Sequence, residues 1–309
     1  MTIKPFNVQS LVLAVKSLEQ RQLVAIPTET VYGLAADAYD DKAVARIYQL
    51  KQRPQFNPLI AHVDGLGMAK QLVTFSQPAL LLAEKFWPGP LTIVLPRKPD
   101  AKLSHLATAG LDTVAVRWPQ HPLATAIISQ LGRPLVAPSA NPSQSISPTS
   151  AADVVAGFGD KCPLVIDGGN CEVGLESTII DMTAAVPTIL RPGGISIDEL
   201  REVLGEVQMA DKDASIKAPG MMRRHYAPGK PLRLNAESVA PDEVLLGFGP
   251  TDTAHNLSPS SDLCEAAANL FRMLRTLDQD ENCSKIAVAP IPNEGLGVAI
   301  NDRLTRAAA

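Results

Sequence analysis

The chain has 309 residues, of which 46% are hydrophobic and 19% charged, and its formal net charge is −4. This length allows two domains, because single hydrophobic cores usually stop growing near ~250–300 residues. The net negative charge argues against a protein whose main task is to coat nucleic acid. No apolar run approaches the ~20 residues that span a bilayer, so we expect no association with a membrane.

The N-terminus and the cysteines indicate a cytoplasmic protein. Residues 1–6 lack the apolar core and the small-residue cleavage site of a signal peptide. The four cysteines form no Cys-x-x-Cys pair and have no metal-binding spacing, which is typical of reduced thiols.

Short apolar runs alternate with helical patterns over the first two hundred residues. Strands are predicted at 23–26, 59–63, 91–95, 113–118, 135–137, 164–167, 178–181 and 188–190. Helices are predicted at 41–51, 79–87 and 123–131, the last ending at Gly132. A capping box, Ser196 with Glu199, opens a further helix that ends near Gly205. Many strands with few helices favour an α/β fold with a twisted mixed sheet and packed helices.

The C-terminal third predicts a linker followed by a small α/β domain. Residues 206–230 lack apolar periodicity and contain two prolines and two glycines among residues 219–229. Beyond them a strand is predicted at 243–248, a helix at 262–277, a strand at 285–289 and a helix at 297–307. We therefore expect domains at 1–205 and 231–309, joined by a linker at 206–230.

Two polar stretches beside predicted strands point to a pocket for anions. Residues 27–34 follow the strand at 23–26, and Lys51, Arg53, Asn57 and His62 surround the strand at 59–63. A lysine or arginine at a helix end often only stabilises the helix dipole. Here the amide and the histidine flank the same strand, so the polar groups converge on one sheet edge. Arginine can grip two phosphate oxygens, and lysine adds a point charge.

Other polar positions allow both structural and binding roles. Thr113 and Arg117 share one face of the strand at 113–118, which is either an ordinary solvated face or a clamp for a carboxylate. The loop at 138–149 and the stretches at 176–178 and 191–194 could make turns and caps or donate to phosphates. No nucleophile elbow, P-loop or glycine-rich dinucleotide fingerprint is present, so covalent catalysis and the usual nucleotide folds gain little support.

Together these stretches resemble the YrdC family. The resemblance rests on TETVYGL at 28–34, KxRPxxNPLI at 51–60, WPGPLT at 87–92, VRxP at 116–119, APSAN at 137–141, EST at 176–178 and LRPG at 190–193. The stretches PGM at 219–221, HYAP at 225–228 and AIxDRL at 299–304 resemble its longer two-domain branch. One departure is Gln144, which stands in the loop where the family usually has glycine.

The resemblance implies an L-threonylcarbamoyladenylate synthase, a nucleotidyltransferase that joins L-threonine, bicarbonate and ATP into threonylcarbamoyl-AMP and releases pyrophosphate. It also implies Mg²⁺ with the ATP, and transfer of the product by a separate complex to an adenosine of tRNA. We expect transient contact with that transferase and weak RNA binding. The chemistry suits the residues, because a labile carbamate needs a closed site and departing pyrophosphate needs cations. No protein nucleophile is required.

The resemblance also implies roles for individual residues. Lys51, Arg53 and Arg117 are expected to act in catalysis, and no metal ligand is assigned. The expected L-threonine site consists of Thr30, His62, Arg117, Ala137 and Ser177. The expected ATP site consists of Arg53, Asn57, Thr113, Ser139, Ser147, Arg191 and Tyr226, with Tyr226 reaching back from the linker as part of a lid.

Three other functions compete with this one. An RNA-binding module without catalysis predicts a basic domain with interleaved aromatic residues, whereas this chain is acidic and 4% aromatic. A carbamoyl-adenylate enzyme of the hydrogenase-maturation type predicts zinc-finger cysteines and further domains, which the sequence lacks. Regulatory binding of ATP without turnover stays open.

Overall fold

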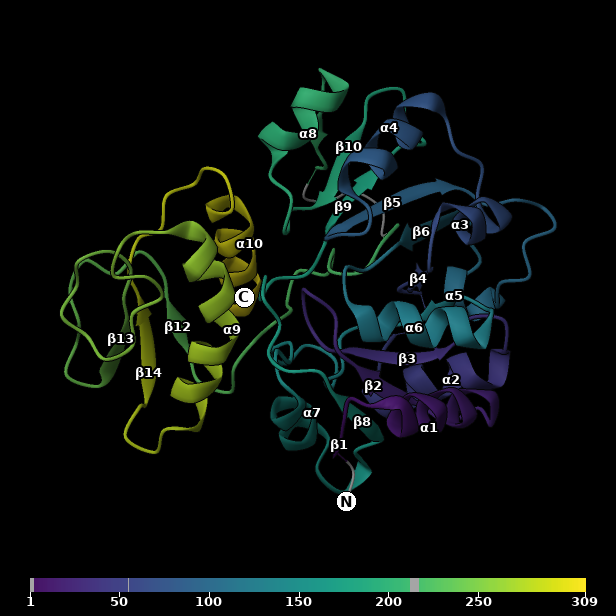
Figure 1. Cartoon of the computed structure of the whole chain (residues 1–309). Helices are drawn as coiled ribbons and strands as arrows, with labels where there is room; N and C mark the ends of the chain where they lie inside the picture. Colours follow the sequence, from purple (N-terminus) through teal and green to yellow (C-terminus); the bar gives the residue numbers. More distant parts are fainter. Residues whose placement is uncertain (1–2, 55, 212–216) are drawn as a thin grey trace.

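The computed structural model describes residues 3–54, 56–211 and 217–309. A large α/β body contains the first two thirds of the chain, and a smaller body contains the C-terminal strands and helices (Figure 1). Helices α9 (Leu263–Gln279) and α10 (Gly297–Ala307) lie on the side of the small body that faces the large one (Figure 1).

Within the described residues, eleven strands form one mixed sheet in the order β1-β8-β2-β3-β7-β4-β6-β5-β9-β10-β11. Strand β4 runs parallel to β6 and antiparallel to β7, which confirms the predicted mixed sheet. The strands are β1 (Ile3–Pro5), β2 (Val24–Ile26), β3 (Gly33–Asp37), β4 (Ile60–His62), β5 (Leu91–Pro96), β6 (Thr113–Arg117), β7 (Leu135–Val136), β8 (Leu164–Asp167), β9 (Thr178–Asp181), β10 (Thr188–Arg191) and β11 (Gln208–Met209).

The helices of the large body begin and end at residues that suit helix termini. Asp40 accepts hydrogen bonds from two backbone amides at the start of α2, and Gly132 ends α6 with a positive φ of 66°. The predicted capping box of Ser196 and Glu199 opens α8. The helices are α1 (Val8–Glu19), α2 (Asp41–Lys51), α3 (Leu66–Leu72), α4 (Gln77–Phe86), α5 (His105–Thr108), α6 (Pro122–Leu131), α7 (Ala151–Phe158), η1 (Gly159–Lys161) and α8 (Ile197–Leu204).

Strand alternation divides the buried residues of the large body between the two faces of the sheet. Val24 and Ile26 of β2 pack with α1 and α6, whereas Ala25 between them packs in the core that contains α2 and α4. Each fully buried leucine or isoleucine stabilises the fold by roughly 1.5–3 kcal/mol. The sheet therefore has helices on both faces over its first half.

Strand β3 was not predicted, because residues 27–34 read as a polar turn-prone run. Gly33–Asp37 contains glycine, alanine and aspartate, which have low strand propensity. It pairs with β2 on one side (Val24 opposite Ala35) and with β7 on the other (Ala36 opposite Val136). Pairing on both edges overrides the weak local preference.

The small body is an α/β domain, as predicted. Its three described strands are parallel and lie in the order β12-β14-β13, with α9 and α10 packed on them. The strands are β12 (Leu232–Arg233), β13 (Glu243–Leu246) and β14 (Lys285–Val288). Strand β11 begins after residue 205 and still pairs with β10 of the large sheet. The domain boundaries proposed from the sequence stay predictions.

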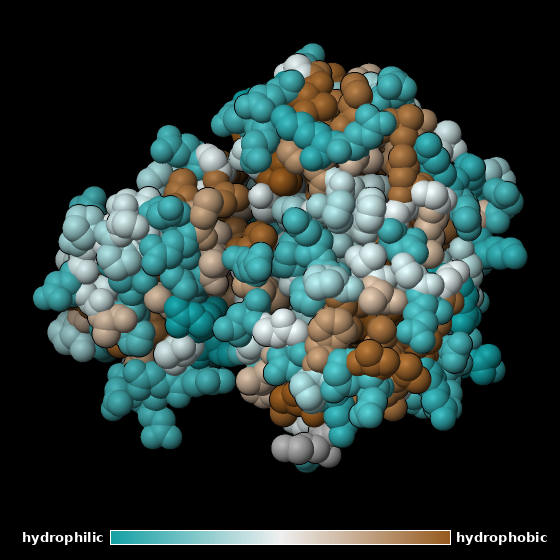
Figure 2. Space-filling view, in the orientation of Figure 1, coloured by the Kyte–Doolittle hydropathy of each residue, from teal (hydrophilic) through white to brown (hydrophobic). Residues whose placement is uncertain are grey.

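The surface is mixed. Hydrophobic patches lie among hydrophilic residues on the face in Figure 2, and the larger patches are on the large body. Among the described residues, no helix combines the length and the hydropathy needed to cross a membrane. The cysteines are all unpaired thiols.

Candidate active site

A pocket of about 40 Å³ lies where strand ends of the large sheet meet the linker. His62 ends β4 and Arg117 ends β6, and these two residues are direct partners on the parallel strands. Arg191 ends β10 and enters the same pocket. The lining residues are Val31, Arg53, Ile60, His62, Arg117, Ala137, Pro138, Ser139, Glu176, Ser177, Arg191, Pro219, Gly220, His225 and Tyr226.

Arg117 is held in the pocket wall by a buried ion pair. Its Nη2 lies 2.8 Å from Oε1 of Glu29, and both side chains are 5% exposed. The alignment is too poor for a hydrogen bond, and neither Glu29 oxygen has a hydrogen-bond partner among the described residues. The Nε of Arg117 is 3.4 Å from the Gly89 carbonyl. Glu29 therefore orients Arg117. A ligand carboxylate that enters the pocket would either compete with Glu29 for this guanidinium or bind it together with Glu29.

The remaining cations of the site are oriented by carbonyl oxygens instead of carboxylates. Arg191 donates from Nε and Nη2 to the Ser177 carbonyl, at 3.1 and 2.8 Å. Arg53 donates to the Pro58 carbonyl at 3.0 Å. Lys51 donates to the carbonyls of Ser139 (2.6 Å) and Asn141 (2.5 Å). Carbonyls orient these groups but do not neutralise them, so the site retains positive charge for an anionic ligand.

Burial and the neighbouring charges also shift the pKa values of the charged groups at this site. Burial, together with the charge of Arg53, lowers the pKa of Lys51 well below its ordinary value. Burial lowers the pKa of Arg53 to about 10. Burial alone would raise the pKa of Glu176, but Arg303 and Arg191 outweigh it and hold the pKa below its ordinary value. Glu176 is therefore ionised, and a bound anion would favour the charged forms of the cations.

His62 is a neutral acceptor at physiological pH. Burial, with the adjacent Arg117, lowers the pKa of His62 to about 3. Its Nδ1 lies 3.1 Å from the Ile60 carbonyl, which can only accept, so Nδ1 carries the proton. Nε2 is then free to accept a hydrogen bond from a ligand. Burial also lowers the pKa of His225 to about 3.

The described part of the linker packs against the sheet. Ala218 is fully buried in a cluster with Ile60, Ala115 and Leu190. Gly220 has a φ of 85°, and a Cβ there would lie 2.6 Å from Cδ of Arg191 and 3.0 Å from the Tyr226 hydroxyl oxygen, so only glycine fits. This packing supports the expected lid against a solvated tether. Residues 212–216 lie outside the described part of the chain.

Tyr226 closes the pocket from the linker side. It is 1% exposed, and its ring stacks on Phe271 of α9 with centroids 5.6 Å apart. Its φ of 63° is rare outside glycine, and such strain typically costs ~1–3 kcal/mol. Its hydroxyl is buried and has no hydrogen-bond partner among the described residues. Burial raises the pKa of Tyr226, so the hydroxyl keeps its proton and can donate to a ligand.

The pocket brings together most of the residues expected to bind substrates. A neighbouring pocket of about 230 Å³ shares Arg53 and His225 and is also lined by Lys51 and Asn57. The expected residues on the first pocket are Arg53, His62, Arg117, Ala137, Ser139, Ser177, Arg191 and Tyr226.

Three expected residues line neither of these two pockets. Thr30 is buried beside Val31, with Oγ1 2.8 Å from the hydroxyl of Thr28. Ser147 donates to Oε1 of Glu176 at 2.5 Å, so its hydroxyl is already engaged. Thr113 begins β6, four residues before Arg117, which places it roughly 13 Å away along the strand.

Sequence reasoning assigned no role to three charged residues that build this site. Glu29 and Glu176 stand within recognised motifs, and Arg303 stands in the stretch at 299–304. All three are buried and ion-paired, which only the structure reveals. Gln144, at the position where glycine was expected, adopts a glycine-like φ of 74°, and its carbonyl accepts from the Ala227 amide of the linker.

Clustered metal-binding side chains are lacking in the part of the chain that the structure describes. No group of three or more histidine, cysteine, aspartate or glutamate residues with metal-binding geometry occurs in the described ranges. The pocket's nearby carboxylates, Glu29 and Glu176, are each paired with an arginine.

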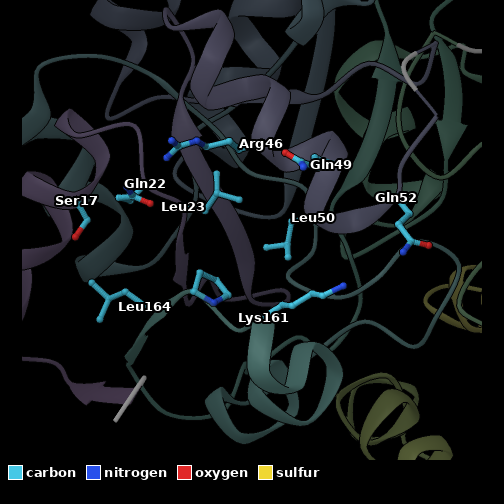
Figure 3. Close-up of a pocket in the computed structure, with 10 residues that line it drawn as sticks. Ser17, Gln22, Leu23, Arg46, Gln49, Leu50, Gln52, Lys161 and Leu164 are labelled. Carbon is cyan, nitrogen blue, oxygen red and sulfur yellow. The ribbon is translucent and has the colours of Figure 1, made fainter.

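A larger pocket of about 660 Å³ lies elsewhere on the large body, between the end of α1, the outer side of α2 and the start of β8 (Figure 3). Its cations, Arg46 and Lys161, are exposed, and Leu23, Leu50 and Leu164 form its apolar part. Exposed cations are neutralised by solvent and salt. The smaller pocket, whose buried cations outnumber the carboxylates beside them, is the better candidate for an active site.

A mixed sheet with buried cations at its strand ends and a linker folded over them is an arrangement suited to an anionic ligand. Family models agree: one described as "Telomere recombination" (Sua5_yciO_yrdC) matches residues 16–193, and one described as "Threonylcarbamoyl-AMP synthase, C-terminal domain" matches residues 195–309. The chain belongs to the Sua5/YrdC family of threonylcarbamoyl-AMP synthases.

Individual relatives match over nearly the whole chain. The threonylcarbamoyl-AMP synthase of Pyrococcus abyssi is 39% identical, over 96% of this chain and 93% of its own length. That of Bacillus subtilis is 38% identical, over 94% and 90%. The crystal structure of P. abyssi Sua5 complexed with L-threonine has a TM-score of 0.90 and 37% identity, over 99% of this chain and 96% of that one.

Proposed function

We propose that this chain joins L-threonine, bicarbonate and ATP into threonylcarbamoyl-AMP and releases pyrophosphate, for threonylcarbamoyladenosine modification of tRNA. The family membership and its near-complete coverage support this activity. The single observation that carries it is a closed pocket lined by three arginines and, among its lining residues, one carboxylate. Even with Glu29 counted beside Arg117, the buried cations are in excess, which favours an anionic ligand. An RNA-binding module would instead expose its cations on an open surface.

L-Threonine occupies the end of the pocket near β4 and β6. Arg117 grips its carboxylate with two parallel hydrogen bonds, a geometry that lysine cannot provide. His62, which keeps Nε2 unprotonated, accepts a hydrogen bond from the amino acid. Ala137 and Ser177 line the same space, and Thr30 lies buried behind Val31, which lines it too.

ATP occupies the end near β10 and the linker. Arg53 and Arg191 bind phosphate oxygens, and Lys51 supplies a point charge from the adjoining pocket. The remaining ATP contacts are assigned to Asn57, Thr113, Ser139, Ser147 and Tyr226. The apolar face of Ile60, Ala115 and Leu190, which the linker covers in this structure, suits the adenine ring.

The reaction needs positioning and charge stabilisation and no protein nucleophile. The neutral amine of threonine attacks carbon dioxide and gives up a proton, or attacks bicarbonate with loss of water, and forms the carbamate. A carbamate oxygen then attacks the α-phosphorus as its bond to the α,β-bridging oxygen breaks and pyrophosphate leaves. Arg53, Arg191 and Lys51 stabilise the charge that builds on the leaving group. Mg²⁺ enters as part of the ATP substrate, bound by phosphate oxygens and water.

The lid must open for ATP to enter. A volume of about 40 Å³ accommodates little more than water, whereas pockets for small molecules measure ~300–1,000 Å³. The buried linker residues fill the difference. Reclosure over both substrates excludes water, which protects the labile carbamate.

The decisive experiment measures pyrophosphate release from ATP. We expect release that requires Mg²⁺, bicarbonate and L-threonine together, with L-serine much poorer. Arg117→Ala should abolish it, whereas Arg201→Ala, at an exposed arginine of α8, should not. Pyrophosphate release that ignores threonine, or none at all with Mg²⁺ present, would refute the proposed function. Salt-sensitive RNA binding indifferent to threonine would then favour the binding module.

A further inference from the structure

Arg303 of α10 reaches from the small domain to the edge of the candidate active site. It is fully buried, and its Nε lies 2.8 Å from Oε2 of Glu176, a residue that lines the pocket. Its Nη1 contacts Asp302 at 2.7 Å. The guanidinium carbon lies 4.9 Å from the ring centroid of Tyr226. One side chain therefore joins the small domain, the catalytic domain and the lid.

The same helix also holds the backbone of the lid. Arg306 donates to the Met222 carbonyl at 2.6 Å, and the amide of His225 donates to the Arg306 carbonyl at 3.2 Å. Asp302 orients both arginines, because its second oxygen accepts from Nε of Arg306 at 2.9 Å. Residues on both sides of the segment 223–224 are thus attached to α10.

We propose that Arg303 is a positioning residue that holds the lid closed, by fixing Tyr226 against the pocket and Glu176 at its wall. This inference rests on the proposed function and gives the small domain a part in catalysis. Arg303 acts through Tyr226 and Glu176. Its Nη2 is buried without a hydrogen-bond partner among the described residues.

The planar fork of arginine suits this position. Nε and Nη1 contact two carboxylates, Glu176 and Asp302, while the plane of the group lies over the tyrosine ring. A lysine ammonium is a single point charge and cannot make these contacts at once. Arg303→Lys should therefore keep Glu176 neutralised but hold the lid less firmly.

Limited trypsin digestion of the full chain tests the lid directly. Arg223 and Arg224 are exposed cleavage sites within the attached segment. Arg303→Met should accelerate cleavage there about tenfold, and Arg303→Lys about threefold. The matched control is Arg272→Met, at an exposed arginine of α9 whose side chain donates to Asn269, and it should be cut like the unaltered chain. Mass spectrometry of the fragments identifies the cut.

Steady-state kinetics separates positioning from a general structural loss. An opened lid should raise the KM for ATP about tenfold in Arg303→Met, whereas a lower fraction of folded enzyme reduces kcat and leaves KM unchanged. If Arg303→Met does not fold, Arg303→Lys decides, with an expected rise of about threefold. In double variants of Glu176→Gln with either Arg303 variant, the KM for ATP should rise by less than the product of the two single increases.

The inference is overturned if the trypsin rates and the KM for ATP of the foldable Arg303 variants match those of Arg272→Met. It is equally overturned if only kcat falls. The proposed function fails separately, when the unaltered chain releases no threonine-dependent pyrophosphate. Trypsin cleavage is independent of turnover and still tests the role of Arg303 in that case.

Discussion

The two pockets of the large body differ in how far their cations are buried. The pocket in Figure 3 measures about 660 Å³, but its cations, Arg46 and Lys161, are exposed. The pocket beneath the linker measures about 40 Å³, and its arginines are at most 8% exposed. Cations at the surface cost the fold almost nothing, whereas buried cations without carboxylate partners destabilise it.

The difference leads us to rank the two pockets by buried charge and not by volume. A protein retains uncompensated buried cations where a ligand will neutralise them. Linker residues fill the space beside the smaller pocket, since Ala218 packs on Ile60, Ala115 and Leu190 and Tyr226 packs against the small domain. Each prediction below alters residues of one of the two pockets, or the pH, and measures the effect on activity or on the free energy of unfolding.

The largest effect is expected at Arg117. Arg117→Ala removes the clamp for the threonine carboxylate and leaves Glu29 buried without a counter-charge, each of which costs several kcal/mol. We expect kcat/KM for pyrophosphate release to fall by about 1,000-fold or more. Arg117→Lys keeps a charge beside Glu29, so it should stay folded and still lose most activity. Wild-type activity in Arg117→Lys would show that no bidentate clamp operates.

A smaller loss of activity, without loss of stability, is expected at Lys51. Lys51→Met keeps the length of the side chain and removes an ammonium that burial disfavours. We expect kcat to fall by about 100-fold, as for loss of one stabilising donor in a buried site. Thermal unfolding should show an unchanged or higher midpoint. A clearly lower midpoint would mean that Lys51 serves the fold and not the phosphates.

The third prediction concerns stability at acid pH. The pKa of His62 is about 3 in the fold and near 6.5 when unfolded, so the unfolded chain binds the proton first. The contribution of neutral His62 to the free energy of unfolding is complete above pH 6.5 and is lost as the pH falls towards 3. At pH 5 the loss is roughly 2 kcal/mol. Urea unfolding at pH 7 and 5 measures it, and His62→Gln should reduce the difference between the two.

The smallest effect is expected in the larger pocket. The double variant Arg46→Ala with Lys161→Ala should change kcat/KM by no more than about twofold, because surface substitutions usually alter energies by less than ~0.5 kcal/mol. The measurement is again threonine-dependent pyrophosphate release. A tenfold loss would contradict the view that exposed cations carry no part of the chemistry.

Much of the fold was readable from local patterns. The strands at 164–167 and 178–181 and the helices at 41–51 and 297–307 occur as predicted. Their apolar periodicity explains this success, and for the helix at 41–51 the cap of Asp40 adds to it. Strand β3 was missed because its residues favour no strand locally and pairing with β2 and β7 decides their conformation.

The candidate site could be predicted from the sequence only in part, and from motifs instead of from periodicity. Motifs pointed to His62 and Arg117, and the parallel pairing of β4 with β6 places these two side by side. No local pattern could show that Arg303 lies against Glu176, more than a hundred residues earlier in the chain. That contact depends on how the small domain packs.

The sequence by itself determined the class of fold, the strands and caps with strong local signals and, through its motifs, the family and the chemistry of the site. The tertiary structure alone decided which charges are buried, which of them are paired and where the linker lies. The physical reason is that propensity and capping act within a few residues. Burial, ion pairing and pKa shifts arise from groups that only the complete packing brings together.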